Sequence, residues 1–279
     1  MTKTFLVTGA STGIGEACAL LLDREGHRVF AGVRKDEDGE RLRSKASDRL
    51  VPVLLDVTDG SQADAVAKRI EAEAGALHGL VNNAGIALGG PIEFLPLEEW
   101  RDQFEVNVFG QLIVTRAMMP LIRQSQGRIV FMGSMSGRVA IGLLGPYAAS
   151  KFALEAIGEA LRQELHPWGL RVSVIEPGAV KTPVWDKARA TADRLELAMP
   201  EEAGDLYEEH ILALRKGIEM SADQGVPAEK VAQAVKHALF ARRPKTRYVI
   251  GLDGRIQSAM VRLLPDRARE AVLRRFVRP

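Results

Sequence analysis

Tyr147 and Lys151 stand four residues apart in the stretch YAASK. The leucines and the isoleucine that follow at helical spacing place this stretch at the start of a helix, so both side chains share one face. A phenol ordinarily loses its proton near about pH 10, and a neighbouring ammonium favours the phenolate. The two residues together form a proton donor and acceptor usable closer to neutral pH. Taken alone, the pair could equally be a surface tyrosine beside a solvated lysine.

Ser134 and Asn107 are two further polar residues in otherwise apolar surroundings. Ser134 directly follows the run RIVFMG, which predicts a strand, and its hydroxyl can hydrogen-bond a substrate oxygen. Asn107 lies in the helical stretch FEVNVFGQLIVTRAMMP. A buried helical asparagine is costly unless its amide is hydrogen-bonded. We therefore expect Asn107 to be either a hydrogen-bonding core residue or the holder of a water in a proton path.

The octet TGASTGIG, residues 8–15, spaces its glycines as G-x-x-x-G-x-G. This fits neither the G-x-G-x-x-G dinucleotide fingerprint nor the phosphate loop that needs Gly-Lys-Ser/Thr. Gly9 and Gly13 permit tight turns, and Gly15 permits close approach of the helix that begins near Ile14. The N–H groups at the start of that helix can bind a pyrophosphate. We predict a dinucleotide-binding loop, with a plain glycine turn as the alternative.

Seven apolar runs alternate with helical stretches and position these motifs. The runs are residues 5–7, 28–33, 50–55, 79–81, 128–132, 170–175 and 247–251, with helices expected between them, notably at 61–74, 97–123 and 147–166. This alternation predicts an α/β fold: a single doubly wound, Rossmann-type parallel sheet of about seven strands with helices on both faces. We expect one domain over residues 1–252, with a substrate lid at about 184–225, and a C-terminal helical extension at 253–279.

The composition is that of a globular protein, with 46% apolar and 27% charged residues. A formal charge of +2 gives no indication of a nucleic-acid partner. One cysteine, Cys18, and five scattered histidines predict no disulfide and no metal site. We see no signal peptide and no apolar run of about 18–20 residues that could span a bilayer, so we expect a cytoplasmic protein.

Six motifs, in this order, resemble those of the short-chain dehydrogenase/reductase family: TGASTGIG, NNAG, VNVFG, the serine after the fifth strand, YAASK and PGAVKTP. The resemblance spans residues 3 to about 182 and extends loosely to 251. It implies that Tyr147 is the general acid in carbonyl reduction and the base in alcohol oxidation. It also implies that Lys151 favours the phenolate and holds the nicotinamide ribose, that Ser134 orients the reacting oxygen, and that Asn107 anchors a water linking Lys151 to solvent.

The same resemblance implies a set of cofactor-binding residues on the loops that follow the strands. They are Gly9, Ser11, Thr12, Gly13, Ile14 and Gly15 in the glycine loop, Asp56 and Val57 beside the adenine, Asn83, Ala84 and Gly85 after the fourth strand, Tyr147 and Lys151 themselves, and Pro177, Gly178, Val180 and Thr182 around the nicotinamide.

Cofactor choice depends on the end of the second strand. A carboxylate there would bind the adenosine ribose and repel a 2′-phosphate. That position is Val33, followed by Arg34 and Lys35, so the sequence favours NADP(H). The acids at residues 36–38 keep NAD(H) possible, because a shift of the turn would bring one of them to the ribose.

The substrate is expected to be a small lipophilic alcohol or carbonyl compound. The segment MSGRVAIGLLGP is mostly apolar, and the lid adds aromatic and methionine side chains. An equal alternative is that these side chains only pack the lid onto the sheet. Within the family the chain resembles the hydroxysteroid and retinol dehydrogenase-like branch more than the ketoacyl-thioester reductases, which usually end soon after the last strand.

Several alternatives stay open at this point. A non-catalytic dinucleotide-binding sensor or scaffold would have no need of the full Asn-Ser-Tyr-Lys set, and the extended epimerases have a different glycine spacing. The tail could cover the cleft, contact another subunit or lie on anionic lipid, and Pro265 favours the first two. The resemblance also implies a homodimer or homotetramer formed through the helices at about 97–123 and 147–166.

Overall fold

The computed structural model describes residues 2–277, apart from the side chains of Lys187, Ala198 and residues 275–277. Residue 1 of the predicted domain and residues 278–279 of the predicted C-terminal extension therefore lie outside the described residues. Seven strands form one sheet in the order β3-β2-β1-β4-β5-β6-β9, and every pairing is parallel. Their bounds are β1 Thr4–Val7, β2 Arg28–Val33, β3 Leu50–Leu54, β4 Gly79–Asn82, β5 Arg128–Met132, β6 Arg171–Pro177 and β9 Arg247–Ile250.

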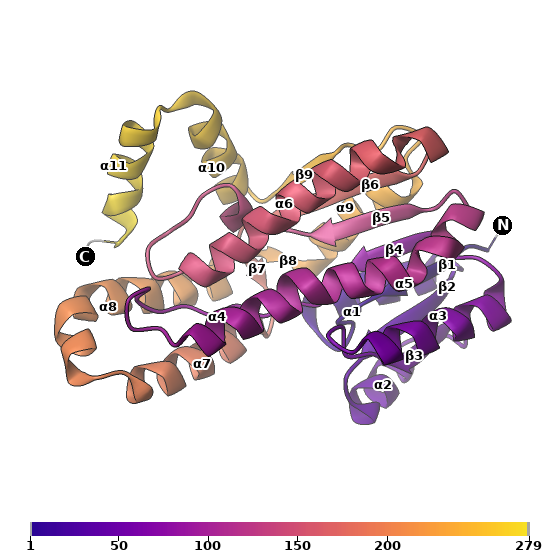
Figure 1. The fold of residues 1–279 in the computed structure, drawn as a ribbon, viewed down its shortest axis with the longest axis horizontal. Helices are drawn as coiled ribbons and strands as arrows, with labels where there is room; N and C mark the ends of the chain where they lie inside the picture. The colour runs from indigo at the N-terminus through magenta and orange to yellow at the C-terminus, as the bar shows by residue number, and fades with distance from the viewer. Residues whose placement is uncertain (1, 278–279) are drawn as a thin grey trace.

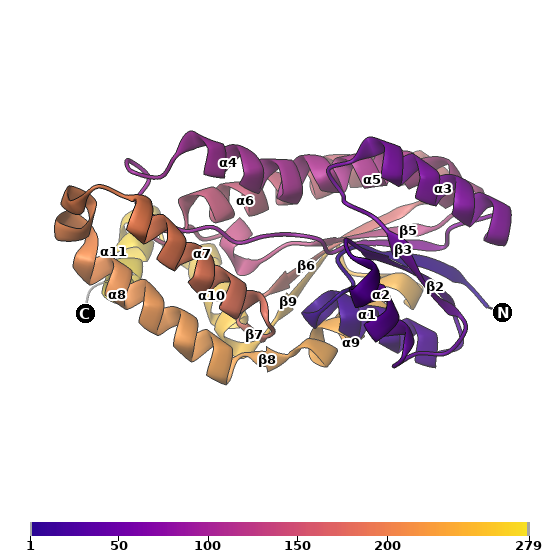
Figure 2. The same ribbon diagram turned by 90° about the horizontal axis from the view of Figure 1, so that it is seen from below.

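Helices cover both faces of this sheet, which confirms the predicted Rossmann-type α/β class (Figure 1). In Figure 2 one layer of helices lies above the sheet and another below it. The upper layer holds α3 (Gly60–Ala74), α4 (Leu97–Phe104), α5 (Gly110–Gln124) and α6 (Gly145–Leu165), and the lower layer holds α1 (Gly13–Arg24), α2 (Asp36–Arg43) and α9 (Ala228–Phe240).

Most strands contribute side chains to two separate cores because successive residues point to opposite faces. Phe5 and Val7 pack with α1 and α9, whereas Leu6 between them packs with α3 and α5. Burial on both faces explains why the strands are apolar throughout rather than alternating.

The helical stretch predicted at 97–123 is helical throughout in the structure, but it is not α-helical throughout. Between α4 and α5 lies a π-helical segment, η1 (Glu105–Phe109), which the sequence did not indicate. Such segments insert one extra residue per turn and occur frequently at functional sites. The α2 helix was not predicted. Its first turn holds Asp36, Glu37 and Asp38, the acids that the sequence placed in a turn.

The segment predicted as a lid forms two helices, α7 (Val184–Ala198) and α8 (Glu201–Gln224). The strands before and after this segment, β7 (Val180–Lys181) and β8 (Val226–Pro227), pair with each other in a short second sheet. The C-terminal tail forms α10 (Leu252–Leu263) and α11 (Asp266–Val277), separated at Pro265. α10 packs against β9, and α11 packs against α8 (Figure 1). In the described part of the chain, no helix is both long enough and apolar enough to cross a membrane.

Candidate active site

The predicted motifs lie together at the carboxyl ends of the strands. The glycine loop follows β1, Asn83 follows β4, Ser134 follows β5, and Pro177 ends β6. In a parallel sheet all these carboxyl ends lie on the same side, where open α/β sheets bind their ligands.

Lys151 is almost fully buried on the first turns of α6. Only 4% of it is exposed, and its Nζ donates a hydrogen bond to the backbone oxygen of Met132 (2.8 Å). The same Nζ lies 5.6 Å from the centre of the Tyr147 ring. Burial lowers the pKa of Lys151 to about 8, because the charged ammonium is removed from water. The structure therefore places a readily deprotonated ammonium beside the phenol.

Tyr147 is partly buried, and burial raises the pKa of its phenol. Ser134 lies close enough for its hydroxyl to lower that pKa in part. The sequence predicted that the ammonium would draw the pKa of Tyr147 down toward neutrality. In the structure burial outweighs every other influence, and the phenol keeps its proton at neutral pH.

Asn107 is fully buried within η1. Its Oδ1 accepts from the backbone N–H of Ile86 (2.8 Å), and its Nδ2 donates to the Ile86 oxygen (2.9 Å) and to Ser150 Oγ (3.0 Å). Of the two roles expected for Asn107, the core hydrogen-bonding role is thus visible. A Cβ on Gly85 would lie 3.1 Å from Asn107 Oδ1 and 3.7 Å from Lys151 Nζ. Gly85 thus lies beside both polar atoms.

The glycine loop needs its glycines for two different reasons. Gly9 and Gly13 have φ values of 61° and 62°, which side chains rarely adopt. A Cβ on Gly15 would lie 2.2 Å from the Gly9 oxygen, so α1 could not approach the loop this closely. At Thr12, which starts the helix, no side chain of the described residues caps the first N–H groups. They remain available to an anion, as predicted for Ile14 and its neighbours.

Two residues fasten this loop to the end of β4. Asn83 Nδ2 donates to the backbone oxygens of Thr8 (3.0 Å) and Gly9 (3.1 Å). Thr8 Oγ1 accepts from the backbone N–H groups of Asn83 (2.9 Å) and Ala84 (3.0 Å). Thr8 was missed from sequence because a threonine at a strand end carries no signal of its own.

The two residues predicted to lie beside the adenine are in the loop after β3. Asp56 Oδ1 accepts from the Thr58 N–H (3.0 Å) and Oγ1 (2.7 Å), so this carboxylate shapes its own loop. Val57 is buried, and its Cγ2 would lie 2.7 Å from a Cβ on Gly110. Val57 therefore packs against the start of α5.

Arg41, which the sequence did not single out, reaches the glycine loop from α2. Its Nη2 donates to the backbone oxygen of Ser11 (2.7 Å) and pairs with Asp38 Oδ1 (2.8 Å). Arg34 and Lys35 are exposed between Val33 and this helix. Leu42 is an apolar residue within a run of charged ones, and in the structure it packs α2 against β3. This residue is the sequence signal that could have indicated a helix here, and with it the neighbouring Arg41.

The segment after β6 lies against both the loop and a buried carboxylate. Thr182 is beside the glycine loop, since a Cβ on Gly13 would lie 3.1 Å from Thr182 Cβ. Glu176, just before Pro177, is fully buried and pairs with Arg138 (2.7 Å). Burial, together with the nearby Glu155, raises the pKa of Glu176 to about 7.

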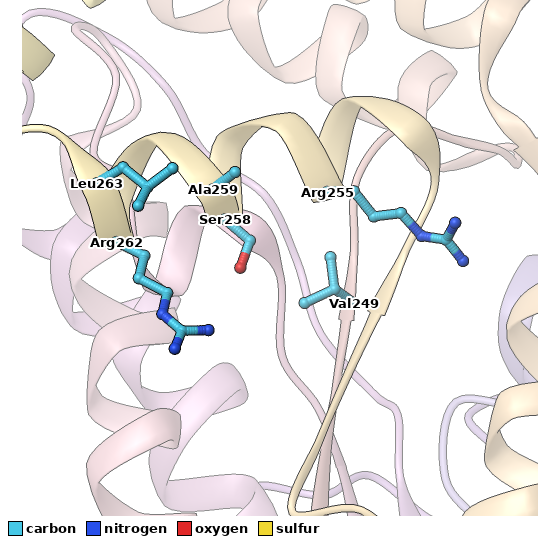
Figure 3. A pocket seen from close by; sticks show the side chains of 6 residues that line it. All are labelled: Val249, Arg255, Ser258, Ala259, Arg262 and Leu263. Carbon is cyan, nitrogen blue, oxygen red and sulfur yellow. The ribbon is translucent and has the colours of Figure 1, made fainter.

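A surface cavity of about 450 Å³ lies elsewhere, on α10 beside the edge strand β9 (Figure 3). None of the predicted catalytic or cofactor residues lines it; its lining consists of Val249, Arg255, Ser258, Ala259, Arg262 and Leu263. It is therefore not the site that the motifs form.

This sheet order, with a glycine loop between β1 and α1, defines a dinucleotide-binding protein of the Rossmann type. A model of the short chain dehydrogenase family matches residues 3–193. The chain therefore belongs to the short-chain dehydrogenase/reductase family, in its retinol dehydrogenase-like branch. It is an oxidoreductase that interconverts an alcohol and its carbonyl compound with NAD(P).

Two relatives and two solved structures illustrate the similarity. An NADPH-dependent 3-dehydrocapnine reductase from Ornithobacterium rhinotracheale is 37% identical over 94% of this chain and 93% of its own length. Retinol dehydrogenase 5 from Mus musculus is 37% identical over 96% of this chain and 86% of its own length. A Burkholderia cenocepacia short chain dehydrogenase in complex with NADP has a TM-score of 0.74 at 27% identity and covers 100% of this chain and 98% of its own. One from Burkholderia phymatum in complex with NAD has a TM-score of 0.80 at 26% identity, with coverages of 94% and 92%.

Proposed function

We propose that this chain is an NADP(H)-preferring dehydrogenase/reductase for a lipophilic alcohol or carbonyl compound, with Tyr147 as the acid and base. The observation that carries the proposal is that Tyr147 lies between Ser134 and the buried Lys151 at the carboxyl ends of the strands, the side on which the glycine loop also lies. A scaffold without turnover would gain nothing from burying a lysine at this cost.

The residues present fit a dinucleotide. The uncapped N-terminus of α1 and the backbone of the glycine loop would hold its pyrophosphate. Lys151 would hold the nicotinamide ribose, and the segment from Pro177 to Thr182 would pack on the nicotinamide. The bound nicotinamide supplies or accepts the hydride.

Tyr147 would donate its proton to the substrate oxygen during carbonyl reduction and take it back during alcohol oxidation. The raised pKa of Tyr147 suits the donor role, because the phenol is protonated at neutral pH. Ser134 would hold the same oxygen by a hydrogen bond. A water near Asn107 and Lys151, which both lie beside Gly85, would let Lys151 exchange its proton.

Preference for NADP(H) is supported by three cations at the adenosine end. Arg34 and Lys35 are exposed after β2, and Arg41 lies on the glycine loop at Ser11. Asp38, one of the acids that kept NAD(H) possible, is paired with Arg41, so its charge is largely offset. The Ornithobacterium relative is also named as NADPH-dependent.

A lipophilic substrate is supported by apolar side chains where the lid meets the sheet. A Cβ on Gly89 would lie 3.6 Å from Leu214 on α8, and one on Gly90 would lie 3.6 Å from Met199 between α7 and α8. Met135 and Leu143, from the segment between Ser134 and Tyr147, are buried. The name of the retinol dehydrogenase relative agrees with such a substrate.

We further propose that residues 1–252 act as one catalytic domain with a lid at 184–225, and that the chain is a cytoplasmic homo-oligomer. Phe109 and Phe152 support an oligomer, because they are 51% and 44% exposed on η1 and α6. The sedimentation coefficient of the purified chain, compared with that of a Phe109→Lys and Phe152→Lys variant, tests this contact. A wild-type monomer would contradict it.

A panel of steroid, retinoid, aliphatic and aromatic carbonyl compounds tests the substrate and the cofactor together. Each compound is assayed by absorbance with NADPH and with NADH separately. We expect turnover of the lipophilic compounds and a higher kcat/KM with NADPH. A strong preference for NADH would contradict the role given to the three cations, and activity confined to hydrophilic carbonyl compounds would contradict the role given to the lid.

A further inference from the structure

We propose that α10 holds the nicotinamide-binding segment in its binding conformation, with Asp253 as the positioning residue. This inference rests on the proposed function, because it assumes that residues 177–182 bind the nicotinamide. It gives the C-terminal tail a role that differs from covering the cleft, contacting a subunit or touching lipid.

The carboxylate of Asp253 is inserted between two glycines. Its Oδ2 accepts a hydrogen bond from the backbone N–H of Ala179 (2.7 Å). A Cβ on Gly178 would lie 2.1 Å from Oδ2, and a Cβ on Gly251 would lie 2.3 Å from Oδ1. A side chain at either position would displace the carboxylate. Gly178 thus has a packing reason to be a glycine, beside the place at the nicotinamide that the resemblance implies.

The same helix also contacts the loop that carries Ser134. A Cβ on Gly254 would lie 3.2 Å from Met135, the residue after Ser134, and 3.5 Å from the backbone N of Gly178. Arg138 from that loop donates to Ser258 on α10 (3.4 Å) and pairs with the buried Glu176 (2.7 Å). α10 thus links the two segments that flank the reacting atoms.

The adenosine end of the site lies away from this contact. β9, which leads into α10, is one edge of the sheet, whereas β2 and α2 lie toward the opposite edge (Figure 1). A disturbance at Asp253 should therefore weaken binding of the nicotinamide half and spare the adenosine half. A general loss of folded structure would weaken both halves equally.

Binding measurements on Asp253→Ala test the proposal by calorimetry with two ligands. One ligand is NADPH, and the other is 2′,5′-ADP, which contains only the adenosine half. We expect the Kd for NADPH to rise about ten-fold, the size of one lost charge-assisted hydrogen bond, and the Kd for 2′,5′-ADP to stay within about two-fold. Asp253→Asn keeps the shape and an acceptor oxygen and should restore most of the affinity. Asp266→Ala, in the first turn of α11, is the matched control and should change neither Kd.

Gly178→Ala supplies a second test that does not depend on the stability of one variant. In the wild-type background its Cβ collides with Asp253, so the Kd for NADPH should rise about ten-fold. In the Asp253→Ala background the collision with Asp253 is gone, so the same substitution should raise the Kd by a clearly smaller factor than in the wild type. Equal effects in the two backgrounds would overturn the proposal.

The remaining outcomes separate this inference from the proposed function. An unchanged Kd for NADPH in Asp253→Ala, or a matching loss for 2′,5′-ADP, would overturn the positioning role alone. A wild-type chain that binds neither NADPH nor NADH would overturn the proposed function, and this inference with it.

Discussion

Replacing Lys151 with methionine should abolish turnover and yet make the protein more stable at neutral pH. The substitution keeps the length of the side chain and removes the buried charge. Burial lowers the pKa of Lys151 from its usual 10.5 to about 8, so the unfolded chain holds this proton more tightly than the folded one. Stability contributed by this residue therefore rises with pH between those two values.

The magnitude follows from these pKa values. At about pH 7 the ammonium is charged in both the folded and the unfolded chain. There the lysine lowers the free energy of unfolding by about 3 kcal/mol relative to an uncharged side chain. Loss of its hydrogen bond to the Met132 oxygen offsets about 1 kcal/mol of that gain. Lys151→Met should thus be more stable by about 2 kcal/mol, which raises Tm by about 4–8 °C for a chain of this size. At about pH 9.5 the wild type has recovered about 2 kcal/mol, so the difference should nearly vanish.

Urea unfolding of both proteins at the two pH values, followed by circular dichroism, measures this difference. Lys68→Met, at an exposed position of α3, is the control and should show no such pH dependence. A Lys151→Met protein that is no more stable than the wild type at neutral pH would refute the reasoning. So would a stability difference that does not change with pH.

Two further predictions concern the cofactor site. Arg41→Ala should lower the preference for NADPH over NADH about five- to ten-fold, because a charged contact with the 2′-phosphate is lost. Arg43, which pairs with Glu40 on the same helix, is the control, and Arg43→Ala should leave the preference unchanged. Equal ratios of the Kd for NADH to the Kd for NADPH in the two variants would contradict the role of Arg41. Gly15→Ala should abolish dinucleotide binding and destabilise the fold by about 1–3 kcal/mol, because the new Cβ meets the Gly9 oxygen at 2.2 Å. Gly204→Ala in α8 is the control and should instead raise Tm, because a Cβ there meets nothing within 4 Å. A Gly15→Ala protein with wild-type affinity for the dinucleotide would contradict the role given to the glycine loop.

The sheet could be predicted from the sequence because its strands are buried on both faces. Phe5, Leu6 and Val7 leave no polar face, and such runs between helices fit only a covered parallel sheet. The position of the site could be predicted too, because polar residues that follow several parallel strands lie together at the carboxyl ends of those strands.

The rest depended on contacts that the local pattern does not contain. α2 is mostly charged and buries little beyond Leu42, so its helical period is hard to recognise. The π-helical turn at Asn107 and the rise in the pKa of Tyr147 both result from tertiary packing. Asp253 meets Ala179 across 74 residues of sequence, and nothing near either residue indicates the contact.

The most direct test of the proposed function is Tyr147→Phe, with binding and turnover measured on the same preparation. The variant keeps the ring beside Lys151 and removes only the hydroxyl. We predict that kcat for a lipophilic carbonyl substrate falls at least about 100-fold while the Kd for NADPH stays within about three-fold. Turnover close to that of the wild type would contradict the assignment of Tyr147 as the proton donor.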